Sequence, residues 1–185
     1  MKNFMNSKMK SKAIFFMTGM SNYGNTTLSP IQQNFLNNLS ISDDVQKIFL
    51  NFPYMYSDMW KPTNILMASV SNTYQYLQAK YMIKENYKKS CLSLFTQYEE
   101  IFILAGSCGL EIFNSLKLDE SLSTKINIFA YGAVAGRIPK IKNIWLIKGS
   151  KDLLAMKQYD LLIQCGHMNY LEQPELKNFI EERIK

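Results

Sequence analysis

Six short apolar runs constrain the fold of this 185-residue chain more than any other feature of its sequence. They are AIFFMTG (13–19), VQKIFLNF (45–52), EIFILAG (100–106), INIFAYG (126–132), NIWLIKG (143–149) and DLLIQCG (160–166). Their hydrophobicity is nearly continuous rather than alternating, which is typical of strands covered on both faces of a parallel sheet. Most of the runs end in Gly, which marks the point where the chain leaves the carboxyl end of a strand.

Stretches with helical spacing lie between or after these runs. Residues 73–95 predict one or two amphipathic helices, residues 109–116 a short helix, and residues 175–184 a C-terminal helix that begins just after Pro174. Residues 57–71 have weak periodicity and predict a loop or a short helix. Strands that alternate with helices specify an α/β fold with right-handed crossovers. We expect one domain over residues 1–185, with a mostly parallel sheet of about six strands, helices on both faces, and a basic N-terminal extension at 1–12.

The composition excludes several classes of protein. Hydrophobic residues make up 47% of the chain and charged residues 19%, a balance typical of globular domains. No apolar run approaches the roughly 20 residues that a membrane-spanning helix needs. The run AIFFM near the start is too short for the core of a signal peptide, so it predicts a strand in a cytoplasmic protein.

Cysteine usage and charge also limit the possible functions. The three cysteines are an odd number without paired spacing, which argues against a disulfide framework or a zinc knuckle. The net charge of +6 comes from scattered lysines and is not accompanied by a nucleic-acid recognition motif. A solvated basic surface is the favoured interpretation, with a mild attraction for anionic substrates or acidic carrier proteins.

Polar residues follow four of the predicted strands. Thr18 follows the first strand, Ser107 and Cys108 the third, Asp152 the fifth and His167 the sixth. Binding sites in open α/β sheets form beyond the carboxyl ends of the strands, so these side chains are the candidates for a site. They supply a nucleophile, an acid and a base in the order Ser, Asp, His, and the chain contains no second histidine.

The segment AGSCG (105–109) resembles the nucleophile turn of the α/β-hydrolase family. That turn is so tight that the residues two positions before and two positions after the nucleophile must be small. Around Ser107 these positions hold Ala105 and Gly109, whereas around Cys108 the second of them would hold a leucine. The resemblance therefore favours Ser107 as the nucleophile.

Two further segments extend the resemblance to this family. LIKGSKDLL is similar to its acid segment and implies Asp152 as the acid, and CGHMNYLEQPELKNFI is similar to its histidine segment and implies His167 as the base. In this family two backbone N–H groups stabilise the oxyanion, which implies Cys108 and Met20 as donors. Thr18 and the following glycine stand where the family often has His-Gly.

The chain departs from the family pattern in ways that imply a minimal, lidless version. Only a dozen residues precede the first strand, and AYGAVAGRIPKIKNIW leaves room only for a loop where the family usually carries a lid. The segment between Asp152 and His167 is too short for the usual helix and strand. Asp160 is a rival acid, but it precedes the last strand and so falls at the opposite end of it.

The resemblance implies a serine hydrolase that cleaves a carboxylic ester or thioester through an acyl-Ser107 intermediate and needs neither a metal nor an organic cofactor. The substrate would be a small acyl ester or thioester, including one delivered by an acidic acyl carrier protein or coenzyme A. Loops would form the acyl pocket, with candidate substrate-binding residues Thr18, Tyr54, Tyr56 and Trp60. The alternatives are an acyltransferase on the same scaffold and a non-catalytic interaction module with a vestigial triad. Taken singly, the turn, the acid and the histidine also fit purely structural roles.

Overall fold

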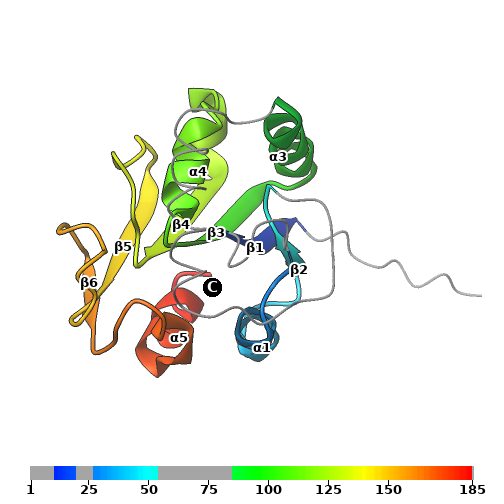
Figure 1. Ribbon diagram of the computed structural model, residues 1–185. Coiled ribbons are helices and arrows are strands. Elements are labelled where there is room, and N and C mark those ends of the chain that lie inside the picture. Colours follow the sequence, from blue (N-terminus) through cyan, green and yellow to red (C-terminus); the bar gives the residue numbers. More distant parts are fainter. Residues whose placement is uncertain (1–10, 20–26, 54–84, 185) are drawn as a thin grey trace, which may run out of the picture.

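A six-stranded parallel sheet forms the centre of the structure (Figure 1). The computed structural model describes residues 11–19, 27–53 and 85–184. Its strands are β1 (Lys12–Thr18), β2 (Val45–Asn51), β3 (Glu100–Gly106), β4 (Ile126–Tyr131), β5 (Asn143–Gly149) and β6 (Leu161–Ile163). They lie in the order β2-β1-β3-β4-β5-β6, and every neighbouring pair is parallel. The predicted strands and the parallel sheet are therefore confirmed.

Burial explains why the sequence shows apolar runs instead of alternation. Strands β1, β3 and β4 occupy the middle of the sheet, and almost every residue in them is buried. Strands β2 and β6 form the two edges and are less completely buried. Strand β6 contains three residues only, so the predicted run 160–166 leaves the sheet after Ile163. Because all six strands are parallel, their carboxyl ends lie together at one end of the sheet, which we call its carboxyl edge.

Helices cover both faces of the sheet in the described part of the chain (Figure 1). One face packs against α3 (Glu85–Gln97) and α4 (Gly109–Ser115), and the other against α1 (Pro30–Asn38) and α5 (Pro174–Glu181). Short 3₁₀ turns occur at Glu120–Lys125 and Tyr170–Glu172. The predictions for 109–116 and 175–184 are confirmed with small changes at the ends. Of the predicted stretch 73–95, residues 73–84 lie outside the described residues, as does the whole of 57–71.

Helix α1 is an element that the pattern of apolar residues did not predict. Its first turn carries a capping box, in which the Ser29 side chain accepts a hydrogen bond from Gln32 N–H and the Gln32 side chain accepts one from Ser29 N–H. Pro30 occupies the first turn, where its missing N–H costs nothing. The sequence SPIQ therefore held a helix-start signal, and the helix it opens buries Phe35 and Leu36 against the sheet.

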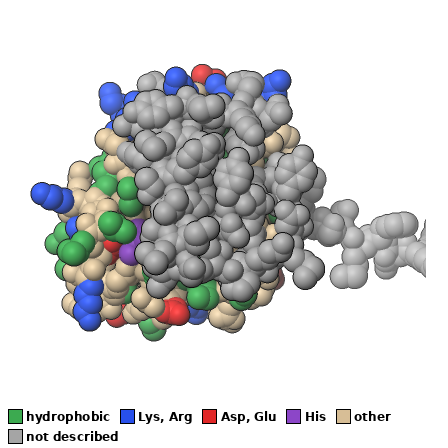
Figure 2. Space-filling view, in the orientation of Figure 1, with side chains coloured by type: hydrophobic (Ala, Val, Ile, Leu, Met, Phe, Trp, Pro, Cys, Tyr) green, Lys and Arg blue, Asp and Glu red, His purple; other side chains and the backbone are tan. Residues whose placement is uncertain are grey.

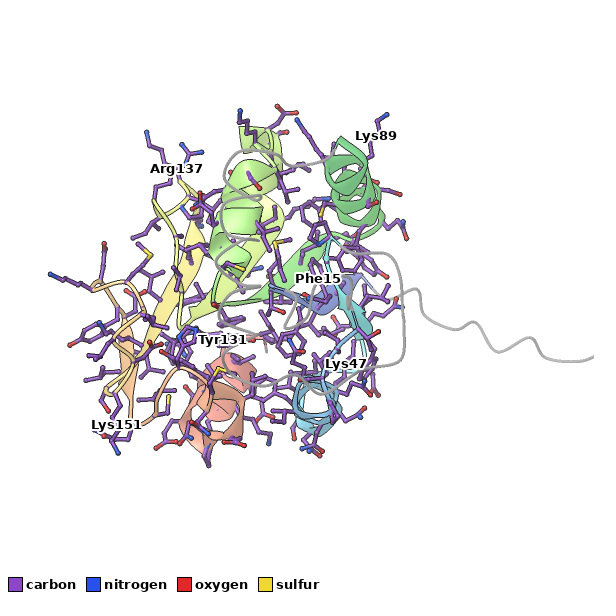
Figure 3. The ribbon with its side chains drawn as sticks, viewed as in Figure 1. Phe15, Lys47, Lys89, Tyr131, Arg137 and Lys151 are labelled. Carbon is purple, nitrogen blue, oxygen red and sulfur yellow. The ribbon has the colours of Figure 1, made fainter. Side chains whose placement is uncertain are left out.

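The basic side chains lie on separate sides of the structure. Lys89, Arg137 and Lys151 extend outward from different sides, while Phe15 and Tyr131 point into the interior (Figure 3). This distribution agrees with a solvated basic surface. Among the helices of the described segments, none combines the length and the apolar character that crossing a bilayer requires.

Candidate active site

Ser107 lies in a strained turn between the end of β3 and the start of α4. Its φ is 52°, in the left-handed region that non-glycine residues rarely adopt. Two backbone hydrogen bonds hold the turn in place: Ser107 N–H donates to Tyr131 O at 3.2 Å, and Val134 N–H donates to Ser107 O at 2.9 Å. The end of β4 and the residues after it thus fix the conformation that exposes the Ser107 side chain.

Gly109 shows why this turn requires a small residue two positions after the serine. A Cβ atom at Gly109 would lie 1.8 Å from the backbone oxygen of Met17 and 3.5 Å from the Cβ of Ala105. The first turn of α4 therefore packs directly against the backbone of β1. A side chain at this position would push α4 away from the sheet and move Ser107 with it.

Cys108 is unsuited to act as the nucleophile. Its side chain is buried in the core beneath α4, and burial raises the pKa of the thiol to about 12. A thiol with that pKa is protonated at neutral pH and is a poor nucleophile. The Ser107 side chain, in contrast, is partly exposed at the carboxyl edge of the sheet. The choice of Ser107 over Cys108 thus has support from burial as well as from the tightness of the turn.

The three side chains that the sequence singled out form one hydrogen-bonded chain. The Ser107 Oγ lies 3.2 Å from Nε2 of His167, and Nδ1 of His167 lies 2.8 Å from Oδ2 of Asp152. The His167 side chain is 20% exposed, whereas that of Asp152 is completely buried. The buried carboxylate therefore holds one ring nitrogen while the other faces the serine hydroxyl, which is the geometry of a Ser-His-Asp triad.

Four hydrogen bonds hold the Asp152 carboxylate. Oδ1 accepts from Leu154 N–H at 3.0 Å and from Ala155 N–H at 3.1 Å, and Oδ2 accepts from Tyr170 Oη at 2.7 Å in addition to His167. Burial is the largest single effect on this carboxyl group and raises its pKa, but the bonds from Tyr170, His167 and Leu154 together lower the pKa below its ordinary value. Asp152 is consequently ionised at neutral pH and cannot rotate freely.

Tyr170 is a member of the site that sequence reasoning missed. Its hydroxyl donates to Asp152 and accepts a hydrogen bond of 2.6 Å from Gly149 N–H at the end of β5. Its ring lies against Gly132, where an added Cβ would come within 2.7 Å of it. Burial, and then the bond to Asp152, raise the pKa of Tyr170, so the phenol stays protonated and remains a donor. The one sequence signal was its position three residues after His167.

Thr18 lies at the carboxyl edge of the sheet, as Ser107 does, but its polar groups form hydrogen bonds to other residues of the protein. Its N–H and hydroxyl both donate to Oδ1 of Asn51, at 2.8 Å and 3.2 Å, and its hydroxyl accepts from Gln32 Nε2 at 3.2 Å. Asn51 Nδ2 returns a bond to Thr18 O at 3.1 Å. These contacts join the carboxyl ends of β1 and β2. A role for Thr18 in substrate binding stays a prediction.

The other predicted site residues differ in what the structure describes. Met20, Tyr54, Tyr56 and Trp60 lie outside the described residues. The rival acid Asp160 is turned away from the histidine: its Oδ2 accepts from Leu146 N–H at 2.7 Å and its own N–H donates to Leu146 O at 2.8 Å. These two bonds join the segment just before β6 to the middle of β5.

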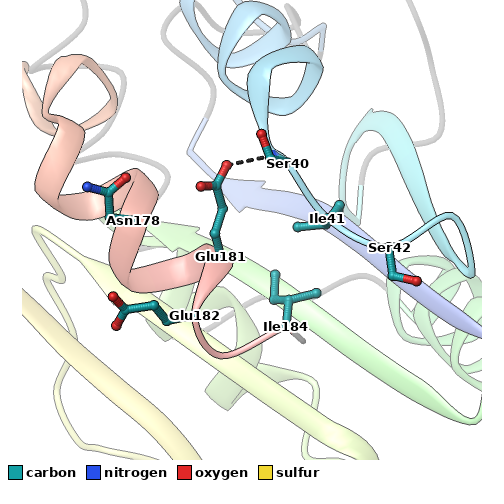
Figure 4. Close-up of a pocket in the computed structure, with 7 residues that line it drawn as sticks. All are labelled: Ser40, Ile41, Ser42, Asn178, Glu181, Glu182 and Ile184. Atoms are coloured by element: carbon teal, nitrogen blue, oxygen red, sulfur yellow. Dashed lines mark hydrogen bonds between the residues drawn. The ribbon is translucent and has the colours of Figure 1, made fainter.

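A pocket of about 380 Å³ lies at the amino ends of the strands, at the end of the sheet opposite the candidate site (Figure 4). It is formed by residues 40–42, just before β2, and by the end of α5, where Glu181 accepts a hydrogen bond of 2.6 Å from Ser40 N–H. It contains no member of the Ser107–His167–Asp152 chain. Within the described segments, no group of three or more His, Cys, Asp or Glu side chains is arranged to hold a metal ion.

Comparison with known proteins does not assign the chain to a family. A scan against models of protein families gives no match, and a search of curated proteins gives none either. The function must therefore be argued from the geometry of the site itself.

Proposed function

We propose that the protein is a serine hydrolase that cleaves a carboxylic ester or thioester through an acyl-Ser107 intermediate. The observation that carries this proposal is the hydrogen-bonded chain from Ser107 Oγ through His167 to the buried Asp152 carboxylate. A structural histidine would not need a strained serine at one nitrogen and a fully enclosed carboxylate at the other. Strain of this kind persists where the surrounding structure maintains it, and it is concentrated at functional sites.

The proposed reaction follows from the position of each group. Neutral His167 accepts the proton of the Ser107 hydroxyl as its oxygen attacks the acyl carbon, and Asp152 stabilises the imidazolium that results. The tetrahedral intermediate collapses when His167 gives that proton to the departing alcohol or thiol, which leaves the acyl group on Ser107. Water then attacks the acyl-enzyme by the same route, and the acid is released. This chemistry requires neither a metal nor an organic cofactor.

The oxyanion of the intermediate needs hydrogen-bond donors. The N–H of Cys108 is one candidate, because it belongs to the residue that follows the nucleophile. The second candidate, Met20 N–H, lies outside the described residues. Removal of a donor of this type by mutation typically lowers kcat by a factor of about 10²–10³.

These features support membership of the α/β-hydrolase family in a minimal form. A serine in a strained strand-to-helix turn and the chain order Ser, Asp, His are its characteristic features. Residues 132–142, between β4 and β5, contain neither a helix nor a strand, which supports a version without a lid at that position. The segment between Asp152 and His167 holds only the short strand β6.

A fluorophosphonate probe tests the proposal directly, because it reacts with serines that a neighbouring base activates. We expect labelling of the wild-type protein at Ser107, loss of labelling in Ser107→Ala and His167→Ala, and retention in Cys108→Ala. An unlabelled wild-type protein, or full labelling of His167→Ala, would show that no triad operates and would favour a non-catalytic interaction module.

Hydrolysis of a short-chain p-nitrophenyl ester then separates the two enzymatic alternatives. Release of free acid without an added acceptor is the result expected of a hydrolase. An acyltransferase would retain the acyl group on Ser107 until an alcohol or an amine is supplied.

A further inference from the structure

The loop that follows β4 contacts both halves of the candidate active site. Its residues 133–137, which we call the bridging loop, contain neither a helix nor a strand. Val134 N–H donates to Ser107 O at 2.9 Å, and Ala133 O accepts from Met156 N–H at 2.9 Å. Met156 lies in the segment that holds Asp152, since the two residues before it donate their N–H groups to the Asp152 carboxylate. The bridging loop therefore joins the turn of the nucleophile to the loop of the acid.

Two side chains of α4 hold the bridging loop from the helix side. Glu111 Oε2 accepts a hydrogen bond of 2.8 Å from Gly136 N–H, and Asn114 Nδ2 donates one of 2.8 Å to Arg137 O. Positions 107, 111 and 114 are four and three residues apart, the spacing that places groups on one side of a helix. Contacts at positions 134, 136 and 137 thus attach the bridging loop to α4 and to the turn before it.

Glu111 is unusual because its carboxyl group is buried. Asp152 and Glu111 are the two buried acidic side chains in the described part of the chain, and Glu111 is 7% exposed. Burial of a polar group is unfavourable unless hydrogen bonds compensate for the lost water. An apolar side chain would fill the same space without that cost, so the contribution of Glu111 is the acceptor that it offers to Gly136 N–H.

Ser107 depends on the bridging loop for its conformation. Its φ of 52° is unfavourable for a residue with a side chain and persists only where neighbouring groups enforce it. Two backbone hydrogen bonds do so, one to Tyr131 O at the end of β4 and one from Val134 N–H. Tyr131 is fixed by pairing with the strands on either side of β4. Val134 has no strand partner, so its position depends on the contacts that hold the bridging loop before and after it.

We propose that Glu111 is a positioning residue for the nucleophile. By accepting from Gly136 N–H, it holds the bridging loop against α4, and the loop in turn presents Val134 N–H to Ser107 O. This inference rests on the proposed hydrolase function and adds a residue to it. Figure 2 shows that the single histidine reaches the surface, where a substrate can approach, whereas Glu111 is buried. Glu111 therefore acts through the bridging loop and does not contact the substrate.

Three substitutions of Glu111 separate the hydrogen-bond acceptor from the acidic group. Glu111→Gln replaces the carboxyl group by an amide but keeps an oxygen acceptor at the same distance from the backbone. Glu111→Asp keeps the carboxyl group and shortens its reach by one methylene group, and Glu111→Met keeps the length of the side chain but removes the acceptor. The control is Asn127→Ala, which deletes a buried side chain that forms three hydrogen bonds at the amino ends of β3, β4 and β5, at the opposite end of the sheet from Ser107.

The measurements are the rate constant for labelling by a fluorophosphonate and the kinetics of hydrolysis of a short-chain p-nitrophenyl ester. We expect Glu111→Met and Glu111→Asp to lower the labelling rate constant and kcat by about tenfold to a hundredfold, because a small displacement of the nucleophile is costly. KM should stay near the wild-type value, since the substrate is bound by other groups. Glu111→Gln should recover most of both rates.

Urea denaturation shows whether each variant is folded under the assay conditions and how much stability it has lost. Asn127→Ala should lower the stability while its labelling rate constant and kcat stay near those of the wild type. Should Glu111→Met fail to fold, the comparison rests on Glu111→Asp, which keeps an acidic side chain at the same position.

Failure of this inference and failure of the hydrolase proposal give different results. A wild-type protein that resists the fluorophosphonate removes the hydrolase function and this inference with it. A labelled wild-type protein, with folded Glu111→Met and Glu111→Asp variants that react at the wild-type rate, overturns the positioning role alone. Glu111→Gln as slow as Glu111→Met would also overturn it, because the acidic group rather than the acceptor would then be required. Rates that fall as far in Asn127→Ala would reduce the effect to a general loss of stability.

Discussion

The hydroxyl of Tyr170 offers the sharpest test of how the Asp152 carboxylate is held. Tyr170→Phe removes one oxygen atom that accepts from Gly149 N–H at 2.6 Å and donates to Asp152 Oδ2 at 2.7 Å. The ring itself, which packs against Gly132, is retained. The substitution therefore deletes two hydrogen bonds in a buried region and leaves the packing nearly unchanged.

The size of the effect can be worked out from these two bonds. A hydrogen bond to a charged group contributes about 1.5–3 kcal/mol, and a buried N–H that loses its acceptor costs about 1–3 kcal/mol. Because the two losses overlap, we expect the free energy of unfolding to fall by about 2–4 kcal/mol. For a chain of this length, each kcal/mol corresponds to about 2–4 °C, so Tm should fall by about 4–16 °C.

The same change should alter catalysis in a direction that a purely structural role does not predict. Without the tyrosine, the charge on Oδ2 of Asp152 is neutralised less and stabilises the protonated ring of His167 more. The acid limb of the kcat/KM profile should therefore move to higher pH. Asp152 keeps its bonds from His167 and two backbone N–H groups, so the loss in kcat should be far smaller than the roughly 10⁴ seen when a triad aspartate is converted to Asn.

The matched control is Tyr131→Phe, which removes the hydroxyl of a buried tyrosine whose ring centroid lies 5.7 Å from that of Tyr170. Urea denaturation, thermal unfolding and a pH profile with a p-nitrophenyl ester should be measured on both variants. The reasoning is refuted if Tyr170→Phe and Tyr131→Phe shift the pH profile equally, or if Tyr170→Phe keeps the wild-type Tm and profile.

Four further predictions concern the turn and the acid. Ser107→Ala should abolish hydrolysis of a p-nitrophenyl ester, while Cys108→Ala should retain much of it. If a thiol-alkylating reagent inactivates the protein and Ser107→Ala stays active, Ser107 is not the nucleophile. Gly109→Ala should lower the free energy of unfolding, measured by urea denaturation, by about 1–3 kcal/mol or more, because the added Cβ would lie 1.8 Å from a backbone oxygen of β1. A variant as stable as the wild type would contradict that contact. Asp152→Asn should lower kcat by about 10⁴, while Asp160→Asn has a mild effect, and the opposite ranking would exchange their roles. The folded protein lowers the pKa of Asp152, so ionisation of this carboxyl group stabilises the fold. This stabilisation is complete above the ordinary pKa of about 3.9 and is lost as pH falls through the lower pKa of the folded state. Asp152→Asn should therefore flatten the dependence of the unfolding free energy on pH below about 4.

The sequence by itself determined the strands and the turn that carries Ser107. Residues in the middle of the sheet are buried on both faces, so β1, β3 and β4 are almost wholly apolar, and this pattern can be read from the sequence of each strand alone. The sequence also indicated that a small residue is needed at Gly109, but the close contact that requires it is with Met17 O of β1, which only the structure shows. The order of the candidate nucleophile, acid and base along the chain could also be read directly.

Only the tertiary structure decided which groups meet at the site. The bonds of Asp152 to His167 and of Asp160 to Leu146 depend on how the last two strands and their loops pack, which no local pattern records. Tyr170 was hidden for the same reason: its ring looks like any core aromatic residue, and its role depends on a carboxylate 18 positions earlier in the chain. Hydrophobic patterning reports burial at each position, whereas the direction of a hydrogen bond between distant segments depends on the final packing of all of them.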